Sequence, residues 1–279
     1  MKELFDKLSF RCSHRVTSAY STSFSHAVKM LRPKIQNDIY AIYGFVRFAD
    51  EIVDSFHDYD KKLLLDEFEI DLYKALDRKI SLNPILNAFQ LVVHKYQIDD
   101  ELIKHFLKSM RADLEKQEYN TTEEYEDYIY GSADVVGLMC LKVFVQGDQN
   151  KFEQLKKPAM KLGSAFQKVN FLRDIKDDSE NLHRHYFPQI NGDVIDREAK
   201  EMIIEEINKD FEEAYKGIVQ LPLEAKFGVY TAYIYYKNLL RKLKTTEADE
   251  ILEKRIRISN PMKMVLLTKS FVHYKLNLL

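Results

Sequence analysis

The 279-residue sequence is poor in the residues that interrupt helices, with only eight glycines and six prolines. The alternation of apolar and polar residues that is typical of strands is almost absent, and apolar residues recur at helical spacing along most of the chain. No internal repeat and no Gly-, Ser- or Pro-rich linker divides it. We therefore expect a single all-α domain over residues 1–279, with helices at roughly 7–30, 34–57, 60–79, 82–96, 99–117, 121–146, 149–180, 194–219, 223–244 and 260–277.

Other absences limit the class of protein. No apolar run approaches the length of about 18 residues that predicts a membrane span, and residues 1–10 are too charged for a signal peptide, so we expect a cytoplasmic protein. The net charge is only −2 and no basic block occurs, which argues against nucleic acid as a partner. The two cysteines, Cys12 and Cys140, form no C-x-x-C pair and are interpreted as buried, reduced thiols.

Charge is concentrated instead inside two stretches that are otherwise apolar. The first is YAIYGFVRFADEIVDSF, residues 40–56. Its Tyr43, Arg47, Asp50 and Asp54 follow one another at spacings of four, three and four, which places them on one stripe of a helix. The flanking residues are mostly apolar, and a helix that is apolar on several sides lies in the interior of a protein.

The second stretch is QKVNFLRDIKDD, residues 167–178. Gln167, Asn170, Asp174 and Asp178 form a similar stripe at spacings of three, four and four. A carboxylate buried without a partner is very costly. The carboxylates of both stretches must therefore be paired with cations or bind metal.

Carboxylate and amide oxygens are hard ligands that suit Mg²⁺, which phosphate oxygens usually help to coordinate. Arg47 and Arg173 accompany the two stripes, and arginine is well shaped to bind phosphate. The sequence therefore predicts that the stripes face each other and hold a diphosphate with Mg²⁺, or with Mn²⁺ as the alternative metal. The competing interpretation is that both are solvated helix faces with local Asp–Arg pairs.

Five motifs occur in order along the chain: YSTSF (20–24), YGFVRFADEIVD (43–54), YIYGSADVVGLM (128–139), LGSAFQKVNFLRDIKDD (162–178) and RHYFP (184–188). They resemble motifs of the squalene/phytoene synthases, the head-to-head prenyl diphosphate synthases, and bacterial phytoene synthase in particular. The resemblance implies an isoprenoid-synthase-type helical bundle with a central cavity.

The resemblance also implies roles for individual residues. The metal ligands would be Asp50, Asp54, Asn170, Asp174 and Asp178. The substrate contacts would be Ser21, Ser23, Phe24, Tyr43, Arg47, Val135, Gly137, Leu141, Ala165, Gln167, Asn170 and Arg173. The catalytic set would be Asp50, Asp54, Asp174, Asp178, Arg47 and Tyr128.

The activity that the resemblance implies is a condensation of two prenyl diphosphates through a cyclopropyl diphosphate intermediate. We expect a Mg²⁺-dependent prenyltransferase that joins two geranylgeranyl diphosphates to phytoene in carotenoid biosynthesis. A dehydrosqualene or squalene synthase that uses farnesyl diphosphate is the alternative, with NADPH needed only for squalene. A second alternative is a non-catalytic relative that acts as an assembly or binding protein. For the final proton, released pyrophosphate, Tyr128 or Tyr43 are all candidate acceptors.

Three residues depart from the family pattern. Glu51 stands where many members have a second aspartate, Asp134 replaces a glycine, and Lys176 replaces a small residue. The family's C-terminal basic and tyrosine contacts have only Lys263 and Tyr235 as candidates.

The C-terminal segment, residues 263–279, mixes leucines with lysines at helical spacing. We interpret it as packing on the core. Peripheral contact with the inner face of a membrane is the alternative.

Overall fold

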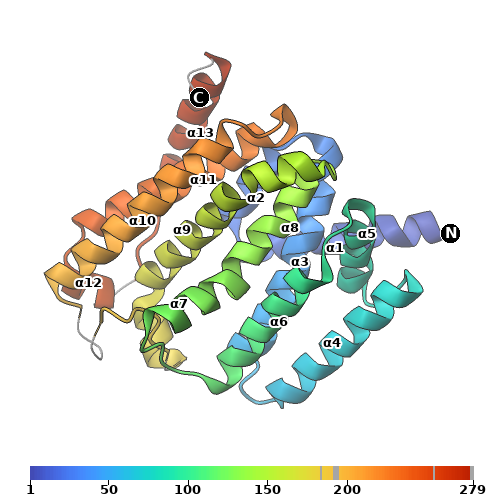
Figure 1. Ribbon diagram of the computed structural model, residues 1–279, viewed down its shortest axis with the longest axis horizontal. Coiled ribbons are helices and arrows are strands. Elements are labelled where there is room, and N and C mark those ends of the chain that lie inside the picture. The colour runs from blue at the N-terminus through green and yellow to red at the C-terminus, as the bar shows by residue number, and fades with distance from the viewer. Residues whose placement is uncertain (183, 191–194, 254, 277–279) are drawn as a thin grey trace.

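The computed structural model describes residues 1–182, 184–190, 195–253 and 255–276. These residues form helices and no strand, which confirms the all-α class (Figure 1). The loop expected around residues 183–193 is only partly within these ranges. The elements are α1 (Lys2–Tyr20), α2 (Thr22–Lys29), α3 (Pro33–Ser55), α4 (Lys61–Arg78), α5 (Pro84–Tyr96), α6 (Asp100–Glu115), α7 (Thr122–Ile129), the π-helical turn η1 (Tyr130–Asp134), α8 (Val135–Phe144), α9 (Gln149–Asn181), α10 (Arg197–Ile218), α11 (Leu223–Thr245), α12 (Ala248–Glu253) and α13 (Asn260–Lys275).

Local chemistry explains where several helices begin. Pro33 and Pro84 occupy first-turn positions, where the missing N–H costs no helical hydrogen bond. Asn83 caps α5, since its side-chain oxygen accepts from the N–H groups of Ile85 and Leu86 at 3.0 and 3.4 Å. Asp148 caps α9 in the same way, through the N–H of Lys151 at 3.0 Å.

The helix expected over residues 7–30 is divided at Ser21. Its backbone is extended (φ −141°, ψ 101°), and its hydroxyl accepts from the N–H of Phe24 at 3.2 Å. Serine competes for backbone groups in this way and favours a helix start over a helix interior. The break turns α2 against α3 and α11, so that both Ser21 and Phe24 reach the central cavity. The short helix α12 was not expected either, because six residues give too little periodicity to recognise.

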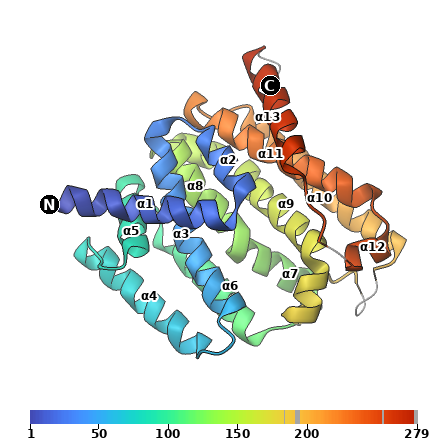
Figure 2. The ribbon, with the colours of Figure 1, turned by 180° about the vertical axis from the view of Figure 1, so that it is seen from behind.

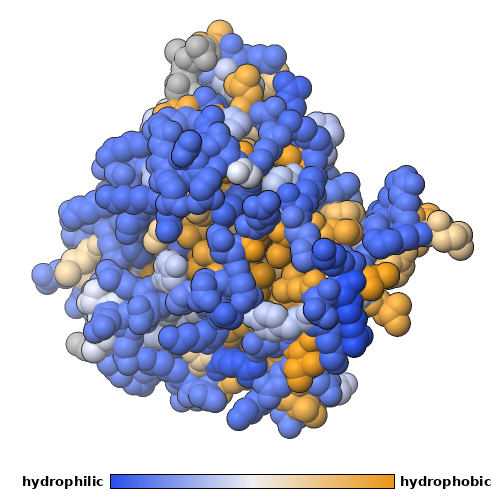
Figure 3. Space-filling view, turned by 45° about the vertical axis from the view of Figure 1, so that its right-hand side comes forward, coloured by the Kyte–Doolittle hydropathy of each residue, from blue (hydrophilic) through white to orange (hydrophobic). Residues whose placement is uncertain are grey.

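Helix α3 is the central element of the bundle. It packs against α1, α5, α6 and α8, while α9 runs between α8 and α10, with α11 beyond them (Figures 1 and 2). Phe45, in the middle of α3, is fully buried and stacks on Phe89 at 4.0 Å between ring centroids. The face seen in Figure 3 is mostly hydrophilic, with apolar surface gathered in its middle. Among the described helices, none is both long and apolar enough to cross a bilayer.

The predicted helix over 121–146 contains the π-helical turn η1 at Tyr130–Asp134. Two glycines allow this turn to press against its neighbours. A Cβ on Gly131 would lie 2.0 Å from the hydroxyl oxygen of Ser109, and one on Gly163 would lie 2.7 Å from the carbonyl oxygen of Ala133. The distortion offsets the faces of α7 and α8, and such turns are frequent at functional sites.

Asp134, the residue that departs from the family's glycine, is buried beneath α9 and accepts a hydrogen bond from the Ser164 hydroxyl at 2.7 Å. Burial raises the pKa of its carboxyl to about 7, against the lowering effect of that hydrogen bond. The unfolded chain ionises this group near pH 4, whereas the folded chain keeps the proton until about pH 7. Folding therefore takes up a proton between these values, and stability falls as pH rises through them.

Replacing Asp134 by asparagine should remove this penalty while keeping an acceptor for Ser164. We expect the advantage of the variant over the wild type, in free energy of unfolding by urea, to grow by roughly 2 kcal/mol between pH 5 and pH 8. Asp127→Asn, at an exposed position of α7, serves as the control and should show no such growth. An advantage that is equal at both pH values would contradict the burial argument.

Candidate active site

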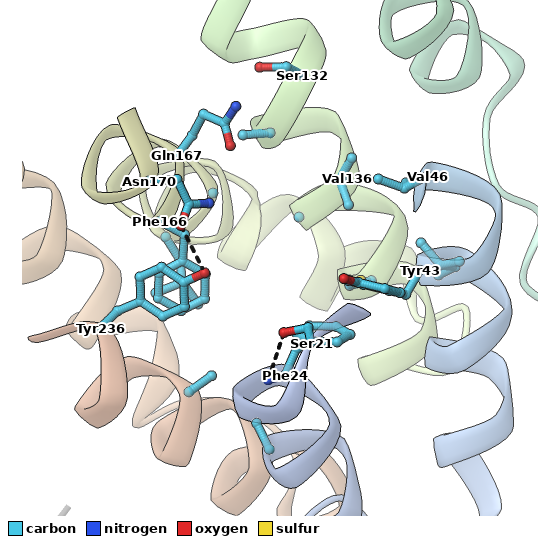
Figure 4. A pocket seen from close by; sticks show the side chains of 18 of the residues that line it. Ser21, Phe24, Tyr43, Val46, Ser132, Val136, Phe166, Gln167, Asn170 and Tyr236 are labelled. Atoms are coloured by element: carbon cyan, nitrogen blue, oxygen red, sulfur yellow. Dashed lines mark hydrogen bonds between the residues drawn. The ribbon is translucent and has the colours of Figure 1, made fainter. Parts of the chain in front are cut away.

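A cavity of about 530 Å³ lies between the helices around α3 and α9 (Figure 4). The first halves of α3 and α9 line the apolar part of the wall. Their second halves line the charged part. Its apolar part includes Val28, Leu31, Ile39, Ile42, Val136, Leu141, Phe144, Leu155, Leu162, Ile218, Leu221 and Val229. Its charged part consists of Arg47, Asp50, Asp54, Asp113, Arg173, Asp174, Asp178, Arg184 and Arg255.

The four aspartates of the two stripes line this one cavity, Asp50 and Asp54 from α3 and Asp174 and Asp178 from α9. They are close enough to influence one another's ionisation. Burial, with a contribution from Asp54, raises the pKa of Asp50 to about 7. Burial, with contributions from Asp174 and from Asp54 across the cavity, raises the pKa of Asp178 to about 8. The acidic ends of α3 and α9 therefore meet at one end of the cavity.

Arg47 lies against two acidic side chains of its own helix. It forms an ion pair with Glu51, and its guanidinium is 4.0 Å from the Asp50 carboxylate. The guanidinium also lies over the Tyr20 ring, 4.4 Å from its centroid, in a cation–π arrangement. Glu51, the departure from the family's second aspartate, thus holds this arginine in place at the edge of the cavity.

Asp174 is held by two arginines. Arg173 forms an ion pair with it along α9, and Arg255 reaches it from the segment between α12 and α13, with oxygen–nitrogen distances of 2.8 and 3.1 Å. Lys176, another departure from the family pattern, points to α12 instead, where its ammonium donates to the carbonyl of Glu253 at 2.9 Å. Lys176 therefore joins α9 to the end of α12, and Arg255 joins it to the segment that follows α12.

Arg184 is a central residue that the sequence analysis did not place in the site, although it belongs to the quoted RHYFP motif. It is only 5% exposed. It pairs with the Asp54 carboxylate at 2.8 Å and donates to the backbone carbonyl of Asp113 at 2.8 Å. Asp113 is buried, and burial raises its pKa to about 7 against the lowering effect of Arg184. Nothing in the sequence around Asp113 distinguishes it from other helical aspartates.

Aromatic rings form much of the remaining wall. Phe171 stacks on Tyr186 at 3.8 Å between centroids, and Phe24 stacks on Tyr43 at 4.8 Å. Phe166 stacks on Tyr236 at 4.0 Å. These rings join the charged end of the cavity to its apolar end.

Tyr236, and not Tyr235, reaches the cavity, where its hydroxyl donates to the Asn170 side chain at 3.3 Å (Figure 4). Tyr235 lies buried behind it, because consecutive helical residues point about 100° apart. Lys263 is also away from the cavity wall, and its ammonium donates to the Thr22 hydroxyl at 2.8 Å.

Most of the other predicted substrate contacts line the cavity: Ser21, Phe24, Tyr43, Arg47, Gly137, Leu141, Gln167, Asn170 and Arg173. Three do not. Val135 and Ala165 are fully buried in the core behind the wall, while their neighbours Val136 and Phe166 face the cavity. Ser23, on the first turn of α2, also lies outside the wall. A motif carried over residue by residue does not give the rotation of each helix.

Tyr128, a predicted catalytic residue, lines the cavity but is almost entirely buried, and its hydroxyl donates to Asp113 at 2.9 Å. Burial, reinforced by the charge of Asp113, holds its pKa well above the usual value. Burial likewise raises the pKa of Tyr43 to about 12. Both phenols are therefore protonated at neutral pH.

The charged end fits divalent cations. The charge of Asp54 raises the pKa of both Asp50 and Asp178, and a cation among these carboxylates would relieve the repulsion. Among the described residues, no three His, Cys, Asp or Glu side chains converge as a ready-made metal site. Mg²⁺ commonly binds to one or two carboxylates, with substrate phosphates and waters completing its shell.

Comparison with known proteins assigns the fold and the family. Residues 17–261 match the family model described as squalene/phytoene synthase. This chain belongs to the squalene/phytoene synthase family. Its similar relatives include phytoene synthase 1, chloroplastic, of Solanum lycopersicum, at 27% identity over 92% of this chain and 66% of the relative. Phytoene synthase, chloroplastic, of Daucus carota is 27% identical over 94% of this chain and 69% of the relative. The chain thus spans about two thirds of the length of these relatives.

Solved structures show the same fold. A dehydrosqualene synthase crystallised with a ligand superposes with a TM-score of 0.82, 22% identity and coverage of 97% of this chain and 98% of the other. Squalene synthase HpnC from Alicyclobacillus acidocaldarius gives a TM-score of 0.74, 21% identity and coverage of 86% and 94%. These confirm the predicted isoprenoid-synthase-type helical bundle. The chain is a member of a family of head-to-head prenyl diphosphate synthases.

Proposed function

We propose that this protein is a Mg²⁺-dependent prenyltransferase that condenses two geranylgeranyl diphosphates to phytoene. The observation that carries the proposal is the meeting of two acidic stripes, from α3 and α9, at one end of an otherwise apolar cavity. The phytoene synthases among its relatives support the choice of the C20 substrate and of this product. We propose that residues 1–279 act as one domain.

The metal ligands in this proposal are oxygen atoms of Asp50, Asp54, Asn170, Asp174 and Asp178, which all line the charged end. Bound Mg²⁺ would supply Lewis-acid stabilisation of the charge that develops on the departing diphosphate. The amide of Asn170 is oriented by Tyr236, whose hydroxyl donates to its oxygen. Asp54 is oriented by Arg184.

Arginines complete the binding of diphosphate. Arg47 and Arg173 already lie beside the carboxylates, so they place positive charge where the leaving group would gain negative charge. Ser21 and Gln167 add uncharged hydrogen-bonding groups to the same cavity (Figure 4). This preorganisation lowers the barrier to breaking the carbon–oxygen bond.

The rest of the wall would protect the allylic cation that remains. Leu141, Val136 and Ile42 offer no nucleophile and exclude water from the prenyl chains. The faces of Phe171 and Tyr186, stacked near the charged end, can stabilise positive charge.

A base must remove the final proton. Tyr128 and Tyr43 are protonated at neutral pH because burial raises both pKa values, so neither phenol is available as a base. We therefore assign the proton to the pyrophosphate that the reaction releases, held close by the arginines. This leaves Tyr128 the role of positioning Asp113, and through it Arg184.

A second candidate is dehydrosqualene synthesis from farnesyl diphosphate. It is favoured by the structural match to a dehydrosqualene synthase along almost the whole chain. Incubation with C15 or C20 diphosphate and Mg²⁺, with and without NADPH, should separate the two. We expect a C40 hydrocarbon from the C20 substrate and pyrophosphate release that EDTA abolishes. A C30 hydrocarbon alone would support the second candidate, and no release from either substrate would favour a non-catalytic binding protein.

The contact between Arg255 and Asp174 leads to a prediction about metal affinity. The Arg255 guanidinium nitrogen lies 2.8 Å from a carboxylate oxygen of Asp174, a proposed metal ligand, so its positive charge competes with a metal ion. Arg255→Gln should therefore tighten Mn²⁺ binding about fivefold when no diphosphate is present, as expected for one charge acting over a few ångströms near the surface. Titration followed by Mn²⁺ EPR measures this. Arg257→Gln, two residues further on and exposed, is the control, and unchanged or weaker binding by Arg255→Gln would refute the competition.

A further inference from the structure

Helix α13 combines exposed apolar side chains with positive charge and no negative charge. Val265, Lys269, Val272 and Leu276 follow at spacings of four, three and four, so they form one outward stripe. The exposed apolar residues of this helix and its C-cap, each 44–63% exposed, are Met262, Met264, Val265, Phe271, Val272 and the C-cap residue Leu276. We call them, together with Lys269 and Lys275, the α13 face.

The charge of this region differs from that of the rest of the chain. Residues 254–279 contain six lysines and arginines and no aspartate or glutamate, although the whole chain has a net charge of −2. The remainder is therefore clearly acidic. The other helix that projects from the body, α1, exposes Leu4 and Leu8 but carries the acidic residues Glu3 and Asp6 close to them in the sequence. Among the described helices, α13 is the projecting helix whose exposed charges are all positive.

Helix α13 lies on the outside of the bundle. It packs on α11, where Phe227 contacts the rings of Phe271 and Tyr274 at 5.9 and 5.1 Å. Its first turn is tied to α2 by the hydrogen bond from Lys263 to Thr22. The helix runs out beyond the body in both ribbon views (Figures 1 and 2), and polar and apolar side chains mingle at this tip of the surface (Figure 3).

We propose that the α13 face docks on an anionic membrane surface. A convex, projecting helix with apolar side chains fits a deformable lipid interface, whereas a rigid protein partner would need a matching groove. Lysines on such a face are attracted to acidic headgroups, and each one strengthens binding. Docking does not depend on which prenyl diphosphate the protein uses.

The cavity gives this docking a consequence. Gly228 and Val229 line the cavity. They directly follow Phe227, whose ring contacts Phe271 of α13. The cavity and α13 are thus on different sides of one helix, α11. A hydrocarbon formed inside would be separated from the bilayer by α11 and α13.

The first test is cosedimentation of the full chain with sucrose-loaded vesicles of phosphatidylcholine, with or without 30% phosphatidylglycerol. We expect binding to the anionic vesicles and little binding to the neutral ones. Val265→Glu/Val272→Glu should reduce the partition coefficient at least tenfold. The matched control, Leu63→Glu/Ile70→Glu, makes the same change at two equally exposed positions of α4 and should bind as the wild type does.

The second test removes only charge. Lys269→Gln/Lys275→Gln should weaken binding by about 30-fold, since one cation near an anionic leaflet contributes about fivefold. Lys62→Gln/Lys108→Gln, on the exposed surfaces of α4 and α6, is the control with the same net charge and should lose little. Circular dichroism of each variant confirms that the helices remain folded.

Three outcomes would overturn the proposal. The wild-type chain could remain in the supernatant with both kinds of vesicle, or the α13 variants could sediment as the wild type does. Analytical ultracentrifugation could also show that Val265→Glu/Val272→Glu converts a dimer to a monomer without affecting vesicle binding. The face would then join two copies of this chain.

Discussion

Asp178→Asn should lower kcat roughly 1,000-fold while the helical fold remains intact, the magnitude typical of losing one preorganised group that stabilises charge in the transition state. Asp178 lies where the acidic ends of α3 and α9 meet, and its pKa of about 8 reflects burial and the nearby charges of Asp174 and Asp54. An amide keeps the shape of the side chain and removes its charge. Affinity for Mn²⁺ should fall together with kcat.

The next residue supplies a matched control. Asp177→Asn makes the same chemical change on the same turn of α9, but Asp177 is not part of the cavity wall. This variant should retain the kcat and the metal affinity of the wild type. If Asp178→Asn kept more than a tenth of the wild-type kcat, or if both variants lost activity equally, the role assigned to the α9 stripe would be wrong.

The second large effect concerns stability. Arg184→Met should lower the free energy of unfolding by about 3–5 kcal/mol, because it leaves the buried carboxylate of Asp113 and the half-buried one of Asp54 without their cation. Arg184 pairs with Asp54 and donates to the carbonyl of Asp113, and the Asp113 carboxylate lies 3.8 Å from it. Urea or thermal unfolding of the metal-free protein measures the loss.

A double variant separates this electrostatic cause from simple loss of packing. Of the two carboxylates that contact Arg184, that of Asp113 is more deeply buried than that of Asp54, and Asp113→Asn removes its charge. The double variant Arg184→Met/Asp113→Asn should therefore recover a substantial part of the stability that Arg184→Met loses. Arg184→Lys should be intermediate, since a lysine keeps the charge but not the fork that bonds to Asp54 and to Asp113 at once. Additive losses in the double variant would show that the ion-pair network is not what Arg184 supports.

The parts of this site that depend on helical periodicity could be predicted from the sequence. Asp50 and Asp54, or Asp174 and Asp178, share a face whatever surrounds them, because four residues make about one turn. The apolar flanks of both stretches indicated burial, and burial with charge indicated a binding site. The all-α class was predicted from the helical spacing of apolar residues along the chain and from the scarcity of glycine and proline.

The parts that depend on tertiary packing could not be predicted. Asp113 enters the site only because α6 packs beside α3, and it is Arg184, from beyond the end of α9, that gives it a partner. Tyr236 lines the cavity and the predicted Tyr235 does not, because the packing of α11 sets the rotation of this helix. A prediction that is wrong by one residue places the side chain about 100° away around the helix. The chain breaks at Ser21 because its hydroxyl caps the start of α2, in competition with the weak tendency of these residues to continue α1 as one helix. The sequence does not show which of the two prevails.

The central claim is that side chains from α3 and α9 together hold divalent metal at the mouth of an apolar cavity. Anomalous diffraction from crystals soaked with Mn²⁺ and a non-hydrolysable prenyl diphosphate tests it most directly. We expect manganese peaks between the carboxylates of Asp50 and Asp54 on one side and Asp174 and Asp178 on the other, with the prenyl chain in the 530 Å³ cavity. Manganese bound elsewhere, or a prenyl chain bound outside the cavity, would contradict the claim.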